Sequence, residues 1–210
     1  MPILNMDSIL KNICSLDSCQ EKKCVKLDRE IRKAIHVRID GGAISDTVKQ
    51  KRCDCLLIMF IKKLDYLYMF FIEVENSPSP DIKDALSQLQ GTINLFSNTI
   101  RDTDFSLINK SYIKSKLTSI NKGNSNLIDE LLAAMKHLNK KKFHIVPVLY
   151  ATRRDSQSKN NLMFRVGLTN YYKIKIYGNN SSPVLFKKCT ESFAPLFEEA
   201  LKMYPQKIHN

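Results

Sequence analysis

The chain has 210 residues, 43% of them hydrophobic, which fits one folded domain with a substantial core and excludes wholesale disorder. Lysine and arginine number 33 against 21 aspartate and glutamate, a formal net charge of +12. A basic surface suits a polyanionic partner, although solubility or a lysine-rich genome would also produce it. No apolar run is long enough to span a membrane, and the first residues lack the pattern of a signal peptide. We therefore expect a soluble, cytoplasmic protein without a membrane partner.

The N-terminal part is expected to contribute two helices. Apolar residues recur at helical spacing over residues 3–13 and again over residues 27–37. Glu30 lies within the second of these helices. Residues 40–42, Asp-Gly-Gly, then break the helical pattern and predict a loop or turn.

Residues 53–76 hold two apolar runs, rich in β-branched and aromatic residues, on either side of a short polar connection. This pattern predicts a β-hairpin whose loop is formed by residues 62–65. In that register Ile61 lies opposite Tyr66. Both runs are almost wholly apolar, as expected for a hairpin that is covered on both faces.

Three carboxylates are expected to converge at the open end of this hairpin. Counting back along the register places Asp54 opposite Glu73, and Glu75 shares the face of Glu73 because side chains alternate along a strand. Like charges directly opposite each other destabilise a sheet, and a divalent cation reverses the sign of that effect. Carboxylate oxygens are ligands for Mg²⁺, which supports phosphodiester hydrolysis. Solvated surface groups at strand ends are the alternative interpretation.

The order of these residues resembles the PD-(D/E)xK nuclease superfamily. Asp54 opens one strand, Glu73-Val74-Glu75 ends its neighbour, and a helix follows. Glu75 stands where the family usually has Lys, and Cys53 replaces the Pro before Asp54. The resemblance covers roughly residues 28–150. It implies an α/β fold of the restriction-endonuclease-like type, a central mixed β-sheet flanked by α-helices, with Mg²⁺ or Mn²⁺ as cofactor.

The resemblance also implies further site residues. Relatives often carry an acidic residue on a helix before the hairpin, for which Glu30 is the candidate. They also carry a glutamine on the helix after the hairpin, where both Gln88 and Gln90 are available. We take Gln88 as the candidate catalytic residue, although the sequence does not choose between the two. For each of these side chains a solvated surface position is the alternative.

After the hairpin the sequence predicts two more helices and a polar insertion. Ser79, Pro80 and Asp81 have the chemistry of a helix start, and an apolar stripe continues to about residue 97. Residues 98–125 are polar and are expected to form short helices or a mobile flap over a substrate. Asn126 is a candidate N-cap for the next helix, which has a broad apolar face.

The C-terminal third predicts three strands and a closing helix. Residues 143–150 form a strand that arrives through a helix, so we expect it to run parallel to its neighbour. Pro147 within it argues for an edge strand or a bulge. Further strands are predicted at residues 162–168 and 171–177, and a helix at residues 191–204.

Three basic clusters supply candidate nucleic-acid-binding residues, which would hold the backbone of DNA. They are Lys49, Lys51 and Arg52 ahead of Asp54; Lys140, Lys141 and Lys142 after a helix; and Arg153 and Arg154 in a loop. Exposed turns, or cations that stabilise a helix C-terminus, account for the same residues without a partner.

The sequence therefore predicts one nuclease-like domain over residues 1–210 that acts as a Mg²⁺-dependent DNA endonuclease. Asp54 and Glu73 would bind the metal, and Glu75 would complete the site and orient or deprotonate the attacking water. Two symmetric cuts call for a homodimer. Resemblance to archaeal Holliday-junction resolvases favours branched DNA over duplex sites. The alternatives are a non-catalytic nucleic-acid-binding protein on a degenerate nuclease fold, and a structural protein with incidental acidic residues.

Overall fold

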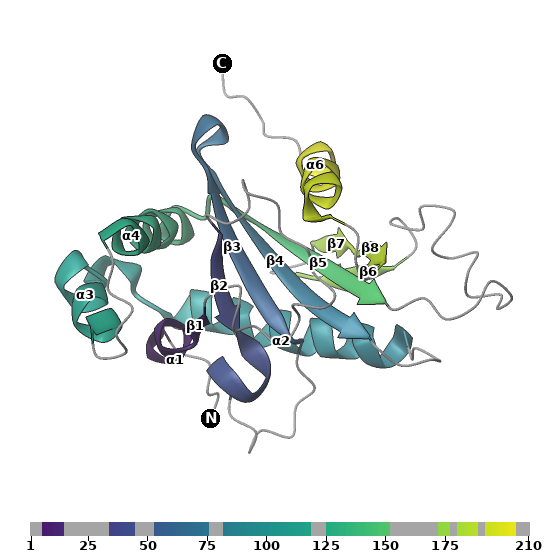
Figure 1. Ribbon diagram of the computed structural model, residues 1–210, viewed down its shortest axis with the longest axis horizontal. Helices are drawn as coiled ribbons and strands as arrows, with labels where there is room; N and C mark the ends of the chain where they lie inside the picture. Colours follow the sequence, from purple (N-terminus) through teal and green to yellow (C-terminus); the bar gives the residue numbers. More distant parts are fainter. Residues whose placement is uncertain are drawn as a thin grey trace, which may run out of the picture.

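The chain folds around a six-stranded mixed β-sheet with helices on both faces, as a computed structural model shows (Figure 1). This confirms the α/β fold class. A separate two-stranded sheet lies beside it. The structure describes residues 6–14, 34–44, 53–75, 82–118, 125–151, 172–176, 180–188 and 192–204.

The predicted hairpin forms the centre of the sheet. Strand β3 spans Cys55–Ile61, the 3₁₀ turn η5 spans Lys62–Leu64, and strand β4 spans Tyr66–Glu75. The register pairs Ile61 with Tyr66, as expected from the apolar pattern. The turn closes because Asp65 takes a left-handed conformation, with φ of 52°.

The N-terminal part adds one short helix and two strands to the sheet. Helix α1 spans Met6–Lys11, strand β1 spans Ile13–Cys14, and strand β2 spans Ile35–Arg38. Both strands pair antiparallel with their neighbours, β1 with β2 and β2 with β3. The predicted Asp-Gly-Gly turn is a single turn of π-helix, η4, which spans Ile39–Ala43.

The predicted helix over residues 27–37 is wrong at its C-terminal end. Ile35 and Val37 are both buried in strand β2 and face the same core cluster, while His36 points to the other face. Their spacing of two residues satisfies a strand as well as it satisfies the edge of a helical stripe. Pairing with β3 then decides in favour of the strand, and the predicted helix over residues 3–13 likewise gives way to β1 at Ile13.

The C-terminal half continues the sheet in parallel. Strand β5, Phe143–Ala151, runs parallel to β4 as predicted, and β8, Leu185–Lys188, runs parallel to β5. Strands β6, Lys173–Lys175, and β7, Ser181–Pro183, form the two-stranded sheet. The sequence analysis did not anticipate β7 and β8, and the predicted strand over residues 162–168 lies outside the described residues.

Pro147 lies in an interior strand, which corrects the expectation of an edge strand. The order of the sheet is β1-β2-β3-β4-β5-β8, so β5 has a neighbour on each side. Pairing with β8 begins only at Val148, however. Pro147 therefore lies just before the part of β5 that is paired on both sides, where a missing amide hydrogen is tolerated.

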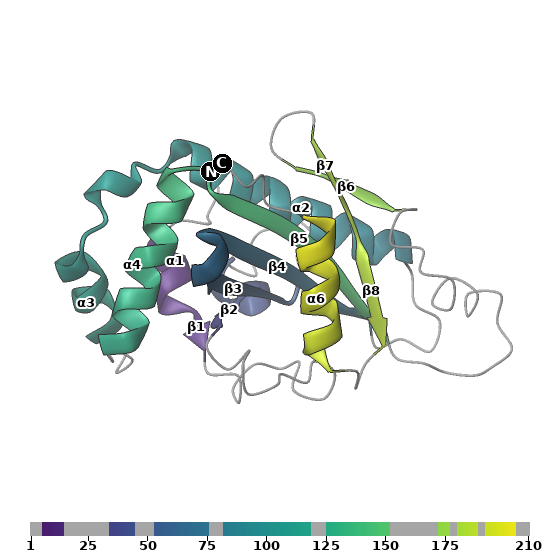
Figure 2. The same ribbon diagram turned by 90° about the horizontal axis from the view of Figure 1, so that it is seen from above.

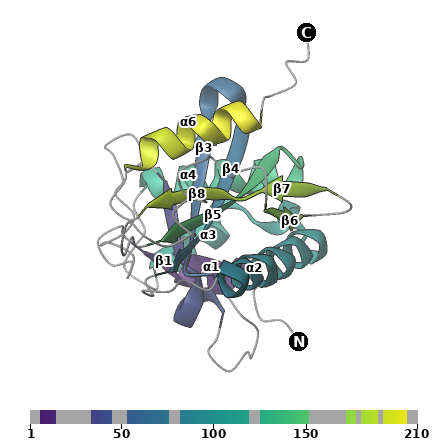
Figure 3. The same ribbon diagram turned by 90° about the vertical axis from the view of Figure 1, so that its right-hand side faces the viewer.

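Helices cover the two faces of the sheet and create two separate cores. Helices α2, Ile82–Asp102, and α4, Ser125–Asn139, pack on one face, and α6, Phe193–Met203, packs on the other. Figure 3 shows α2 and α6 on opposite sides of the sheet. Ser192 caps α6, which agrees with the helix predicted there. Residues of β4 alternate between the two cores, so the strand carries no charged residue before Glu73.

The polar insertion expected over residues 98–125 is largely helical. Its first residues extend α2, and η6, Phe105–Leu107, and α3, Lys110–Thr118, follow. Helix α3 packs against α4 and α1, so that the three gather at one side of the molecule (Figure 2). None of the described helices combines the length and the apolar character needed to cross a bilayer.

Candidate functional site

The carboxylate of Asp54 lies against the end of β4. Asp54 directly precedes β3, and its backbone amide donates to the carbonyl of Ile72 at 3.1 Å. Its side-chain Oδ2 accepts a hydrogen bond from the amide of Val74 at 2.6 Å. The hairpin therefore brings Asp54 to the end of β4 that carries Glu73 and Glu75, next to the position opposite Glu73 that the sequence predicts.

Glu73 continues the row of side chains that strand β4 buries under helix α2. Phe71, two residues earlier, contacts Phe96 of α2 edge to face, with ring centroids 5.2 Å apart. Glu73 is only 4% exposed, and its Oε2 atom has no hydrogen-bond partner among the described residues. A buried carboxylate oxygen without a partner is costly, because it has lost water and gained nothing in exchange.

Burial, together with the neighbouring carboxylates of Asp54, Glu75 and Asp40, raises the pKa of Glu73 from 4.5 to about 9. The backbone amide of Asp54 partly opposes this effect. Four acidic residues therefore share one electrostatic environment at the open end of the hairpin. The arrangement favours either a proton or a cation at Glu73.

Asp40 is the member of this cluster that the sequence analysis missed. It lies in the π-helix η4, where the amides of Ile39 and Asp40 both donate to the carbonyl of Asp54, at 3.0 and 3.4 Å. The adjacent glycines had marked the segment only as a turn. Single π-helical turns are frequent at functional sites, but this feature is visible only in the structure. Glu30, the predicted fourth carboxylate, lies outside the described residues.

The donor chemistry of the cluster fits a hard divalent cation. Carboxylate oxygens are the preferred ligands of Mg²⁺ and Mn²⁺. The Oε2 atom of Glu73 has no hydrogen-bond partner among the described residues, so it could serve as a metal ligand. In the part of the chain that the structure describes, no three His, Cys, Asp or Glu side chains lie close enough together to hold a metal ion. The carboxylates repel each other, so binding a cation would require them to close around it.

Helix α2 supports the site through Thr92. The buried hydroxyl of Thr92 accepts a hydrogen bond from the amide of Cys53 at 2.8 Å and donates to the carbonyl of Gln88 at 3.0 Å. It thereby ties the residue before Asp54 to the middle of the helix. The side chain of Gln90 instead forms two hydrogen bonds with the backbone of Lys175 on β6, both at 2.8 Å. This bidentate contact gives Gln90 a structural role.

Replacing Thr92 with Val is expected to destabilise the protein by about 1 to 3 kcal/mol, because the buried amide of Cys53 loses its acceptor. Urea unfolding measures the effect. Thr99→Val on the same helix is the comparison variant, since it removes a hydroxyl that donates to the carbonyl of Leu95 one turn earlier. Equal losses of stability in the two variants would contradict a special role for Thr92.

Cys53 stands where the superfamily motif has Pro, and its thiol is not a candidate nucleophile. The side chain is completely buried. Burial, and then the carboxylate of Glu73, raises the pKa of the Cys53 thiol well above its usual range. The thiol therefore stays protonated, and thiolate chemistry is not available at this position.

The predicted nucleic-acid-binding residues either lie far from the carboxylates or fall outside the described residues. Lys49, Lys51, Arg52, Arg153 and Arg154 lie outside the described residues.

The run of lysines from Lys140 to Lys142 lies at the opposite end of the hairpin. The carbonyl of Lys142 accepts from the amide of Leu67, about 20 Å along β4 from Glu73. The ammonium of Lys142 also pairs with Asp65 at 2.6 Å. This run therefore does not contribute to the carboxylate site itself.

Comparison of the chain with protein-family models, with curated proteins and with solved structures finds no match. The function is therefore argued from the geometry and chemistry of the site.

Proposed function

We propose that the chain is a metal-dependent DNA endonuclease that hydrolyses phosphodiester bonds. The observation that carries the proposal is the buried, unpartnered Oε2 of Glu73 among the carboxylates of Asp54, Glu75 and Asp40. Without a cation this carboxyl keeps a proton at neutral pH, because burial and its acidic neighbours raise its pKa. A divalent ion that takes the place of the proton would give Oε2 the partner that it lacks among the described residues.

The arrangement of the strands supports a restriction-endonuclease-like fold of the PD-(D/E)xK type. Asp54 directly precedes β3, and the antiparallel β4 ends in Glu73-Val74-Glu75. Helix α2 follows, and β5 then returns parallel to β4. These are the features on which the resemblance rests, with Glu75 again in the position of the usual Lys.

Asp54 and Glu73 would hold Mg²⁺ or Mn²⁺, with Asp40 as a further carboxylate beside them. The ion supplies Lewis-acid stabilisation of the charge that develops on the phosphate. Glu75, half-buried at the end of β4, would accept a proton from the attacking water. Gln88, one turn from the Thr92 contact, would orient that water. Because Glu75 replaces Lys, the chain supplies no cation at this position.

DNA is the proposed substrate because a chain with a net charge of +12 that concentrates carboxylates at one site suits a polyanion and a cation together. We propose branched or otherwise structured DNA, such as a Holliday junction, as the preferred form. Cutting two strands symmetrically requires two sites, so a homodimer belongs to the proposal. Light scattering on the purified protein measures that stoichiometry.

The test is cleavage of supercoiled plasmid and of a labelled four-way junction in the presence of Mg²⁺, Mn²⁺ or EDTA. Metal-dependent nicking is expected, with faster cleavage of the junction than of a linear duplex of the same sequence. DNA binding without cleavage under every condition would replace the nuclease with the non-catalytic DNA-binding alternative. Neither binding nor cleavage would overturn both.

A further inference from the structure

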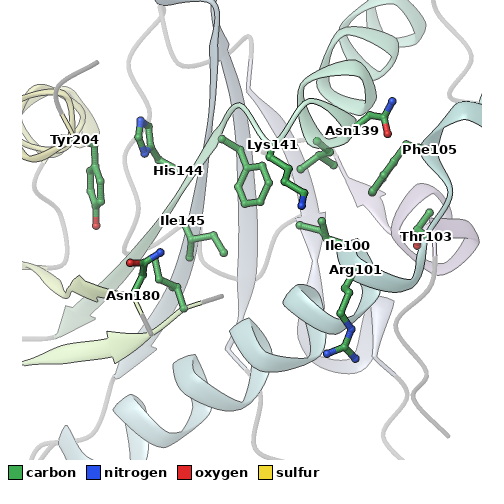
Figure 4. Close-up of a pocket in the computed structure, with 13 residues that line it drawn as sticks. Ile100, Arg101, Thr103, Phe105, Asn139, Lys141, His144, Ile145, Asn180 and Tyr204 are labelled. Atoms are coloured by element: carbon green, nitrogen blue, oxygen red, sulfur yellow. The ribbon is translucent and has the colours of Figure 1, made fainter. Parts of the chain in front are cut away.

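A cavity of about 560 Å³ lies at the opposite end of the sheet from the carboxylates. It opens between the last turns of α2 and α4, the first residues of β5, and Tyr204 after α6 (Figure 4). Its volume is that of a pocket for a small organic molecule. Its apolar wall is formed by Ile100, Phe105, Leu138, Phe143, Ile145 and Ile176.

The polar groups of the cavity are neutral or positively charged. Among the described residues that line it there is no aspartate or glutamate. Arg101 is one of two cations, but its Nε atom pairs with Asp102 at 3.0 Å, and Figure 4 shows its guanidinium pointing away from Lys141. Lys141, the other cation, points toward Ile100 across the cavity, and no described carboxylate pairs with it. Among the described residues that line the cavity, Lys141 is therefore the cation that a ligand could reach without breaking an ion pair.

Lys141 has a strained backbone conformation, and the turn at the end of α4 does not require a lysine there. Its φ is 55°, in the left-handed region that favours glycine. Its amide donates to Leu138 at 3.0 Å and the next amide donates to His137 at 2.9 Å, which together close the end of α4. Lys136 and Lys140 already supply cations to this helix end. A glycine at position 141 would avoid this backbone strain. Stabilisation of the helix end therefore does not by itself explain why position 141 is a lysine.

We propose that this cavity binds a small organic anion. A flat apolar or aromatic body would lie against the wall of Ile100, Phe143 and Ile145, and a carboxylate, sulfonate or phosphate group would face the ammonium of Lys141. The neutral side chains of Thr103, Asn139 and Asn180 would provide hydrogen bonds to its polar edges. The site is separate from the carboxylate cluster and does not depend on the proposed nuclease activity.

The test uses the fluorescent aromatic sulfonate 8-anilinonaphthalene-1-sulfonate as the probe, with its uncharged analogue N-phenyl-1-naphthylamine beside it. Lys141→Gly is expected to weaken binding of the sulfonate about tenfold and to leave binding of the neutral probe unchanged. The same substitution is expected to keep or raise the thermal midpoint, because it relieves the left-handed strain. Lys140→Ala, at the exposed neighbour of the same charge, is the matched control and should bind the sulfonate normally.

Ile100→Trp, which fills the cavity, is expected to abolish binding of both probes in a protein that remains folded by circular dichroism. Displacement by adenosine monophosphate or by 1-naphthoate then distinguishes a phosphate ligand from a carboxylate ligand. Equal binding of the sulfonate to Lys141→Gly and to the native protein would overturn the proposal. So would unchanged binding to Ile100→Trp, or displacement of the probe by duplex DNA and by neither small anion.

Discussion

Asp54→Asn is expected to reduce metal-dependent DNA cleavage by about a thousandfold or more, because it removes one negative ligand from the metal site. The amide oxygen of Asn can still accept the hydrogen bond that Asp54 takes from Val74, so the hairpin should keep its geometry. Initial rates of plasmid nicking at saturating Mg²⁺ measure the effect. DNA binding in EDTA should be unchanged or tighter, since the variant repels phosphates less.

Glu198→Gln is the matched control for this experiment. Glu198 is an exposed carboxylate on α6, on the other face of the sheet from Glu73, and its loss should leave the cleavage rate unchanged. A variant of Asp54 that binds DNA and cleaves at the native rate would remove Asp54 from the catalytic site. It would also contradict the proposed metal site, in which Asp54 is a ligand.

Glu73→Gln is expected to stabilise the metal-free protein, most of all at alkaline pH. Burial raises the pKa of Glu73 from 4.5 to about 9, so the folded protein keeps a proton that the unfolded chain releases above pH 4.5. The free energy of unfolding of the native protein therefore falls by about 1.4 kcal/mol per pH unit as the pH rises from 4.5 toward 9, and is unaffected below that range. The Glu73→Gln variant has no titratable proton at this position, so its free energy of unfolding does not fall with pH in this way.

Urea unfolding in EDTA at about pH 5 and about pH 8 measures this difference, with several kcal/mol expected between the two proteins at the higher pH. Added Mg²⁺ should stabilise the native protein and leave Glu73→Gln unchanged, because the ion replaces the missing partner of Oε2. A variant that is less stable than the native protein at about pH 8 would mean that the Glu73 carboxylate already has a stabilising partner.

The hairpin was predictable because its signals are local. Two apolar runs separated by four residues allow one register, and that register alone sets Asp54 beside Glu73 and Glu75 on one face. The strand β5 and helix α6 were predictable for the same reason, since each carries its own continuous pattern. The burial of Glu73 was not, because it depends on helix α2 closing over the end of β4.

The misread elements all depend on partners that are distant in the sequence. Ile35 and Val37 fit a helix or a strand, and pairing with β3 decided the outcome. Strands β7 and β8 are too short to carry a clear period, and they form because β5 and β6 offer unpaired edges. Asp40 joins the carboxylates only because the π-helix η4 is held by the carbonyl of Asp54.

By itself the sequence determined the α/β class, the central hairpin and the three carboxylates at its open end, because alternation of side chains and loop length are properties of neighbouring residues. Only the tertiary structure decided that one carboxylate oxygen, Oε2 of Glu73, is buried without a partner among the described residues. It also decided that Gln90 is held by β6 and that the lysines from Lys140 to Lys142 lie far from the site. These three features depend on how the helices pack across the sheet. That packing is set by the whole core, which no single segment of the chain encodes.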